Sequence, residues 1–158
     1  MILYYTKSEK TKIFAESIHE IYPMPLYKLE SDINKRGTLS FFFTALIRTI
    51  TNKPEPVSNM PDVAMPEEIF VCSPIWGGNL AAPVKYFLSN AKLNNTRVNL
   101  ILTASTPVPG YEKNAHKYLQ KIDCIVGDMY LFATDSKIMP DKSIITEQMR
   151  ELLKQPLQ

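Results

Sequence analysis

The sequence predicts an α/β fold: a single doubly wound, five-stranded parallel sheet in the order 2-1-3-4-5, with helices on both faces. Two observations predict it. Short apolar runs, several of them without polar alternation, are typical of strands covered on both faces. Between them apolar residues recur at helical spacing, so strands and helices alternate along the chain and the helices connect parallel strands. A length of 158 residues with 45% hydrophobic residues suits one domain.

Each element follows from its own pattern. The strands are expected within residues 2–5, 27–29, 69–72, 98–102 and 124–132. The helices are expected where apolar or small residues form a stripe: Ile13, Phe14, Ser17, Ile18 and Ile21; Val84, Phe87, Leu88 and Ala91; Ala115, Tyr118, Leu119 and Ile122; and Ile145, Met149, Leu152 and Leu153.

An insertion at about residues 31–66 interrupts this alternation, within a domain that we expect to span residues 1–158. It predicts a helix followed by a proline-rich loop, since four prolines favour extended or irregular backbone. The helical face is Leu39, Phe43, Leu46, Ile47 and Ile50, widened by Phe41 and Phe42. Two interpretations stay open: a crossover helix packed on the sheet, or, for Phe41–Phe43, an exposed lid or dimer contact. A homodimer through residues 31–51 is a further hypothesis.

Composition excludes several classes of protein. The 18 Lys and Arg against 16 Asp and Glu give a net charge of +2, which argues against a dedicated nucleic-acid binder. No apolar run reaches the roughly 20 residues of a membrane span, and the first residues lack the basic region of a signal peptide. Cys72 and Cys124 lie in apolar runs, as expected of free thiols in the reducing cytoplasm.

The loop after the first strand is a candidate phosphate cradle. It reads TKSEKT, with hydroxyls at Thr6, Ser8 and Thr11 and ammonium groups at Lys7 and Lys10. Backbone N–H groups at a helix N-terminus, with such side chains, bind anions. The alternative is that Ser8 or Thr11 only caps the helix.

The loops after the third and fourth strands are expected at the same edge of the sheet, where ligands bind in doubly wound folds. In the third-strand loop, Pro74 and the single tryptophan, Trp76, precede a glycine pair. Such a tryptophan can stack on a planar ring, while adjacent glycines allow backbone to approach it closely. The alternative role for Trp76 is to anchor the loop to the core.

The fourth-strand loop runs from Thr103 to Tyr111. Its hydroxyls and backbone amides could bind the polar edge of a heterocycle. Tyr111 has two possible roles: it covers that ring, or it is an ordinary residue at the start of a helix.

Other chemistries lack their residues. The Cys-x5-Arg of low-molecular-weight phosphatases is missing, because Gly78 and Tyr130 stand six residues after the two cysteines. Tyr5 and Thr6 occupy the place where a response-regulator receiver needs acids. There is no GxGxxG, and neither His19 nor His116 lies in a cluster of histidine, cysteine and acidic residues at the spacing of a metal site.

Together the three loops resemble the flavodoxin family, and more closely its quinone and NAD(P)H reductase branch. The family's phosphate signature, T/S-x-T/S-G-x-T, compares with TKSEKT, and FVCSPIWGGNLAAPVKYFL resembles its third-strand segment. The resemblance implies non-covalent FMN that carries one or two electrons. It places the phosphate and the ring against Thr6, Ser8, Lys10, Thr11, Pro74, Trp76, Gly77, Gly78, Asn79, Ser105 and Tyr111.

One residue departs from that signature: Glu9 replaces the phosphate-loop glycine. Glycine tolerates a left-handed turn, and a carboxylate repels phosphate. Two functional hypotheses therefore stand. The first is an FMN protein that transfers electrons, favoured as an NAD(P)H- or quinone-linked reductase because the chain lacks the acidity of a pure electron carrier. The second is a binding module of this fold that has lost FMN.

Overall fold

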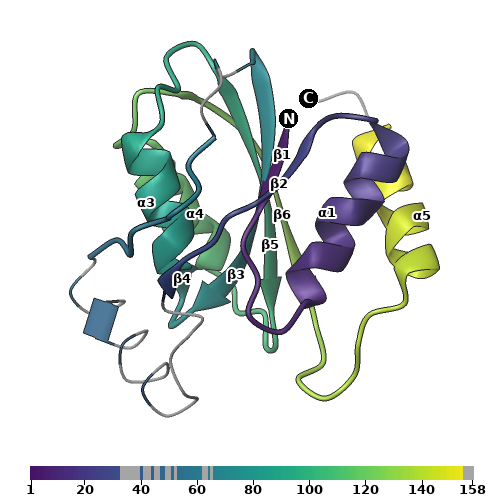
Figure 1. Ribbon diagram of the computed structural model, residues 1–158. Helices are drawn as coiled ribbons and strands as arrows, with labels where there is room; N and C mark the ends of the chain where they lie inside the picture. The colour runs from purple at the N-terminus through teal and green to yellow at the C-terminus, as the bar shows by residue number, and fades with distance from the viewer. Residues whose placement is uncertain are drawn as a thin grey trace.

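The computed structural model describes residues 1–32, 40, 44, 47–48, 51, 53–61, 64 and 66–154 (Figure 1). Its elements are β1 (Ile2–Tyr4), α1 (Lys10–Ile21), β2 (Leu26–Lys28), β3 (Glu68–Trp76), β4 (Asn79–Leu80), α3 (Ala82–Asn90), β5 (Arg97–Ala104), α4 (Tyr111–Leu119), β6 (Ile125–Ala133) and α5 (Lys142–Leu153).

The sheet has the predicted topology. Its strand order is β2-β1-β3-β5-β6, and every neighbouring pair on this path is parallel. These five strands are the five predicted from the sequence, so the order 2-1-3-4-5 is confirmed. The short β4 was not predicted; it folds back antiparallel on β3, with Ile75 opposite Leu80 and Trp76 opposite Asn79.

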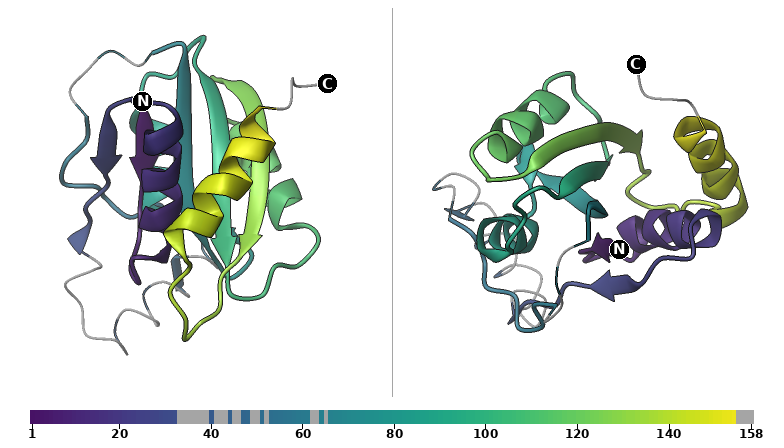
Figure 2. Two further views of the ribbon diagram at one scale, coloured as in Figure 1. Left: turned by 90° about the vertical axis from the view of Figure 1, so that its right-hand side faces the viewer. Right: turned by 90° about the horizontal axis from the view of Figure 1, so that it is seen from above.

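Of the described helices, α3 and α4 cover one face of the sheet and α1 and α5 the other (Figures 1 and 2). Strand residues alternate between the faces, so Leu3 and Val71 pack in the core beneath α3 and α4, whereas Tyr4 and Cys72 pack in the core beneath α1 and α5. Cys72 is fully buried, and that burial raises the pKa of its thiol far above the usual value. Cys72 is therefore part of the core and not a nucleophile. Among the described helices, none is long and apolar enough to cross a bilayer.

Most of the inserted helix predicted from the sequence, including Phe41–Phe43, lies outside the described residues, and so does most of the suggested dimer contact. The segment after it is held by backbone contacts. The Glu55 amide donates to the Ala82 carbonyl (3.1 Å), and the Ser58 amide donates to the Glu30 carbonyl (2.9 Å). The 53–61 segment therefore connects the start of α3 with the chain just beyond β2.

Candidate functional site

A pocket of about 200 Å³ lies at the carboxyl edge of the sheet, the edge to which β3 and β5 point at the bottom of Figure 1. Four segments, at or just beyond the carboxyl ends of β1, β3, β5 and β6, supply its walls. The lining residues are Ser8, Lys10, Thr11, Pro74, Ile75, Trp76, Thr103, Ala104, Ser105, Thr134 and Ser136. The pocket thus brings together residues from all three loops singled out in the sequence.

The loop after β1 leads directly into α1. Thr11 is buried, and its Oγ1 lies 2.9 Å from Thr103 Oγ1, so α1 is joined to the end of β5. Thr6 is also buried, and its Oγ1 has no hydrogen-bond partner within the described part of the chain. Ser8 is exposed. Neither Ser8 nor Thr11 is the N-cap of α1. The N-cap residue is Glu9, and its side chain makes no capping hydrogen bond to the helix. The first N–H groups of α1 therefore keep their capacity for an acceptor.

Glu9 adopts the backbone conformation that a glycine favours. Its φ is 62° and its ψ −6°, in the left-handed region. Its carboxylate is half exposed and pairs with Lys12 Nζ at 3.6 Å and Lys28 Nζ at 3.9 Å. Glu9 does not line the pocket. The chain therefore keeps the turn of the phosphate signature despite the missing glycine, and the negative charge of Glu9 is matched by two lysines.

Lys10 links the pocket to a loop that sequence reasoning did not assign to it. Its side chain is buried, and Nζ donates to the Asp135 carbonyl. The Thr134 amide donates to the Ala104 carbonyl at 2.8 Å, which holds the start of this loop against β5. Thr134 and Ser136 follow the last strand of the sheet, away from the strand-order reversal, so their position gave no reason to select them. Their hydroxyls were the available signal.

Trp76 and the glycine pair form a hairpin rather than an open loop. Gly77 and Gly78 connect β3 to β4 with φ values of 52° and 80°, and two consecutive positive φ values are the geometry of a type I′ turn. Trp76 is half-buried and meets the Tyr5 ring edge to face, with centroids 5.3 Å apart. Trp76 therefore anchors the loop to the core and also lines the pocket, whereas its stacking on a planar ring stays a prediction.

The start of α4 supports this hairpin. A Cβ placed on Gly78 would lie 3.4 Å from the Tyr111 ring, and Asn114 Nδ2 donates to the Gly78 carbonyl at 2.9 Å. Asn79 Nδ2 donates to the Gly77 carbonyl at 3.2 Å. Tyr111 therefore packs on the turn, and neither Tyr111 nor the glycines line the pocket. Asn114 was missed, because an amide on an amphipathic helix carries no sequence signal.

The electrostatic character of this edge is positive. Among the described residues that line the pocket, Lys10 is the charged one, the others include the hydroxyls of Ser8, Thr11 and Thr103, and none carries a carboxylate. The positive end of the α1 dipole points to the same place. A small, hydroxyl-rich pocket with an ammonium group and a helix N-terminus is suited to an anion such as a phosphate group.

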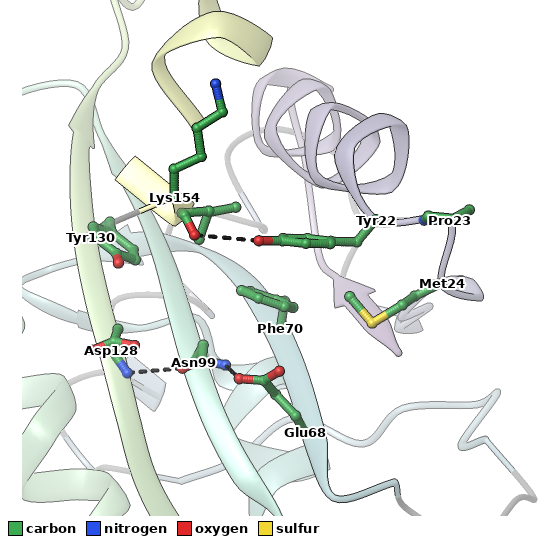
Figure 3. A pocket seen from close by; sticks show the side chains of 10 residues that line it. Tyr22, Pro23, Met24, Glu68, Phe70, Asn99, Asp128, Tyr130 and Lys154 are labelled. Carbon is green, nitrogen blue, oxygen red and sulfur yellow. Dashed lines mark hydrogen bonds between the residues drawn. The ribbon is translucent and has the colours of Figure 1, made fainter. Parts of the chain in front are cut away.

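A second, larger cavity of about 550 Å³ opens at the other end of the sheet (Figure 3). Tyr22, Phe70 and Tyr130 line it together with Glu68 and Asp128, among others. It contains none of the residues that the sequence predicted for the site. This cavity is larger than the pocket at the carboxyl edge, but the loops singled out in the sequence converge on the smaller one, and ligands of doubly wound sheets bind at that edge.

Comparisons with known proteins bear on the fold. No protein-family model matches the sequence, and the search of curated proteins finds no match either. A proposed flavoprotein from Bacteroides eggerthii DSM 20697 is 15% identical with a TM-score of 0.70, covering 98% of this chain and 97% of its own. A flavoprotein from Lactobacillus acidophilus NCFM, solved in complex with FMN, is 24% identical with a TM-score of 0.64, covering 82% and 90%.

A third structure, a flavodoxin, WrbA-like protein from Agrobacterium tumefaciens, is 13% identical with a TM-score of 0.55, covering 94% of this chain and 89% of its own. At identities this low the likeness establishes the fold alone, and that fold agrees with the strand order observed here. The resemblance seen in the sequence is confirmed at that level: the chain has a flavodoxin-like fold.

Proposed function

We propose that this protein binds FMN non-covalently at the carboxyl edge of the sheet and transfers electrons through it, as a small NAD(P)H- or quinone-linked reductase. The observation that carries the proposal is the 200 Å³ pocket, in which the start of α1, the Lys10 ammonium and hydroxyls from several loops converge. In support, a flavoprotein of the same fold from Lactobacillus acidophilus NCFM was solved in complex with FMN.

The pocket fits the phosphate end of FMN. Pockets that enclose a whole drug-sized ligand measure roughly 300–1,000 Å³, so a pocket of about 200 Å³ suits the phosphate and the adjoining chain. Thr6 Oγ1, buried beside this loop without a partner among the described residues, has an unused donor and acceptor. Ser8, Lys10 and Thr11 would hold the phosphate, with Thr134 and Ser136 closing its far side.

The isoalloxazine ring would lie outside this pocket, across the edge of the sheet. Trp76 would flank the ring, Gly77, Gly78 and Asn79 would face its edge, and Ser105 would contact its pyrimidine side. Because Tyr111 supports the Gly78 turn, it would act by holding that turn in place. The flavin, when bound, supplies the electron transfer, and the protein binds it, orients it and limits its contact with water.

Charge and thiols favour a reductase in a reducing compartment. The net charge of +2 gives this chain no general acidity with which to dock a basic electron partner. Cys72 and Cys124 are both free, as expected in the cytoplasm. NADH, NADPH or a small quinone is therefore the proposed redox partner.

The alternative function is a binding module of this fold without FMN, and it rests on Glu9. A left-handed glutamate strains the backbone by about 1–2 kcal/mol, which is the feature that favours this alternative. The pairing of Glu9 with Lys12 and Lys28 favours the flavin-binding function, since it compensates the carboxylate beside the cradle.

The decisive experiment is the visible absorption spectrum of the purified protein, before and after incubation with excess FMN and removal of the unbound fraction. We expect retained flavin bands. Stopped-flow reduction of the yellow protein by NADH and NADPH then separates a reductase, which bleaches rapidly, from a carrier, which does not. A colourless protein after reconstitution would contradict the proposed function and favour the binding module.

Two lysine variants locate the phosphate. Lys10→Met removes the ammonium that lines the pocket, and because hydrogen bonds to charged groups contribute about 1.5–3 kcal/mol, FMN affinity should fall at least tenfold. Lys12→Met removes the same charge two residues along α1, on an exposed side chain paired with Glu9 and Glu16. Equal losses in the two variants would assign the effect to general electrostatics and contradict the placement of the phosphate.

A further inference from the structure

The 550 Å³ cavity at the amino edge of the sheet has walls of two kinds (Figure 3). The upper part in that view is apolar. The Tyr22 and Phe70 rings are nearly parallel, with centroids 6.2 Å apart and an interplanar angle of 16°. Tyr130 and Met24 extend this wall. Ring faces and a thioether are suited to an aromatic or alkyl body, and the size is that of a small-molecule site.

The lower part is polar and offers acceptors. Asn99 is buried, and its side chain is fully engaged, since Nδ2 donates to Glu68 Oε1 (2.9 Å) and Oδ1 accepts from the Asp128 amide (2.9 Å). Asn99 thereby lies between the two acidic residues, bonded to the carboxylate of Glu68 and to the backbone of Asp128, as Figure 3 shows. The Asn99 side-chain amide therefore has little capacity to bond a ligand, and the remaining acceptors of this wall are the carboxylates of Glu68 and Asp128.

Those carboxylates share one guanidinium group. Arg97 Nε lies 3.9 Å from Glu68 Oε1, and Arg97 Nη2 lies 3.5 Å from Asp128 Oδ2. Both distances are at the long end for ion pairs. One cation between two carboxylates leaves negative charge at the cavity wall.

The helices add to that negative potential. The cavity lies where α1 and α5 end, with Tyr22 and Lys154 at their C-terminal caps, and the C-terminus of a helix is the negative end of its dipole. Tyr22 Oη donates to the Leu153 carbonyl at 3.3 Å, which ties the two helix ends together. The field in the cavity therefore favours a positively charged ligand.

Two cations of the chain lie nearby. The Lys154 ammonium points away from the cavity in Figure 3. The Met1 amino group contacts Met24 Sδ at 3.3 Å and the Glu68 carbonyl at 3.4 Å. Burial lowers the pKa of this amino group, although Glu68 opposes the shift, so it compensates the carboxylates less than an exposed ammonium would.

We propose that the amino-edge cavity is a second binding site, independent of FMN, for a small organic ammonium ion with an aromatic or alkyl body. The ammonium group would be bound by Asp128 and Glu68, and the body would lie against Tyr22, Phe70 and Tyr130. Cations bind favourably to aromatic ring faces, which reinforces the carboxylates.

The test uses three probes of one shape and different charge: phenethylamine as the cation, 2-phenylethanol as the neutral analogue and 3-phenylpropanoate as the anion. Each is titrated into ¹⁵N-labelled protein while amide chemical shifts are followed. We expect saturable shifts with phenethylamine around residues 22–24, 68–70 and 128–130, weaker binding of the alcohol and none of the anion. Equal binding of all three probes, or shifts confined to residues 6–11 and 76–79, would overturn the proposal.

A matched pair of variants tests the charge. Asp128→Asn keeps the side-chain shape and the backbone bond to Asn99 but removes a carboxylate, and a roughly tenfold loss of phenethylamine affinity is expected from losing a charged hydrogen bond. Asp123→Asn makes the same change on an exposed residue outside the cavity and should bind phenethylamine as the parent does.

Thermal melts show whether both variants fold. A folded Asp128→Asn protein with parental affinity would refute the role of the carboxylate. An FMN titration of the same variant keeps the two proposals separate, because it should match the parent whether or not phenethylamine binds.

Discussion

At its carboxyl edge the sheet carries a pocket of about 200 Å³ lined by hydroxyls and one ammonium group, whereas at its amino edge it carries a cavity of about 550 Å³ lined by aromatic rings and carboxylates. Both follow from one topology. Because the strands on the main path of the sheet are parallel, α1 begins at the first edge and ends, together with α5, at the second. The positive end of the α1 dipole therefore lies at the carboxyl-edge pocket, and the negative ends of the α1 and α5 dipoles lie at the amino-edge cavity. The contrast teaches that a parallel sheet can place cavities of opposite electrostatic character at its two edges.

The largest expected effect comes from Gly127, which should affect only the amino edge. A Cβ there would lie 2.3 Å from Asn99 Oδ1 and 2.9 Å from the Val98 carbonyl. Gly127→Ala should therefore lower the free energy of unfolding by about 1–3 kcal/mol, as overpacking does. Urea denaturation measures it. Adding Asn99→Ala should recover part of the loss, and the folded fraction should keep FMN. A fully stable Gly127→Ala protein would mean that the irregular β5–β6 pairing between Val98 and Leu100 shifts at little cost.

The next largest effect concerns the carboxyl edge, where it tests the role of Trp76 in FMN binding. Trp76→Ala should weaken FMN binding about two- to tenfold and alter the flavin bands, since aromatic stacking contributes about 0.5–1.5 kcal/mol. Trp76→Phe keeps an aromatic ring and should retain most of the affinity. Fluorescence titration of FMN measures both. If the alanine variant binds FMN with an unchanged spectrum, Trp76 is only an anchor against Tyr5.

A smaller effect concerns the left-handed turn. Glu9→Gly relieves backbone strain but gives up weak exposed ion pairs and adds chain entropy in the unfolded state, so a net gain of about 0.5–1 kcal/mol is expected. Glu9→Ala loses the same carboxylate and keeps the strain, so it should not gain stability. Thermal melts compare the three proteins. If only Glu9→Gly binds FMN, the parent site has decayed and the binding-module function is favoured.

The smallest effect lies at the start of α5. Asp141 Oδ1 accepts hydrogen bonds from the Ser143 hydroxyl and from the amides of Ser143 (2.8 Å) and Ile144 (3.4 Å). These bonds, the one from the Ser143 hydroxyl above all, hold the pKa of Asp141 below its usual value. A lowered folded-state pKa stabilises the protein above the unfolded-state pKa, about 3.9, and this contribution is lost as the pH falls through the folded-state value.

Asp141→Ala should therefore lower the melting temperature slightly at pH 7, and its difference from the parent should shrink below about pH 4. The exposed Asp123→Ala is the control. A difference that is constant from pH 7 to pH 2 would show that the carboxylate charge does not matter at this cap.

Most strands and helices of this protein could be predicted from the sequence, because the patterns that identify them are local. The continuous apolar run at Ile69–Cys72 and the helical stripe from Val84 identify β3 and α3, and handedness and crossover rules leave few ways to assemble such elements. The candidate phosphate-binding loop could also be predicted, because the hydroxyls and lysines of TKSEKT lie within six consecutive residues. Strand ends were less accurate, and β3 runs on to Trp76 because it pairs with β4.

The sequence by itself determined the alternation of strands and helices, the sheet order and the loops that meet at the carboxyl edge, because periodicity and turn residues act over a few neighbouring positions. Only the tertiary structure decided that Lys10 reaches the Asp135 carbonyl, that Tyr111 supports Gly78, and that Asn99 bridges Glu68 and Asp128. Those contacts join residues far apart in the chain. Their geometry follows from how the helices pack on the two faces of the sheet, and no local pattern encodes it.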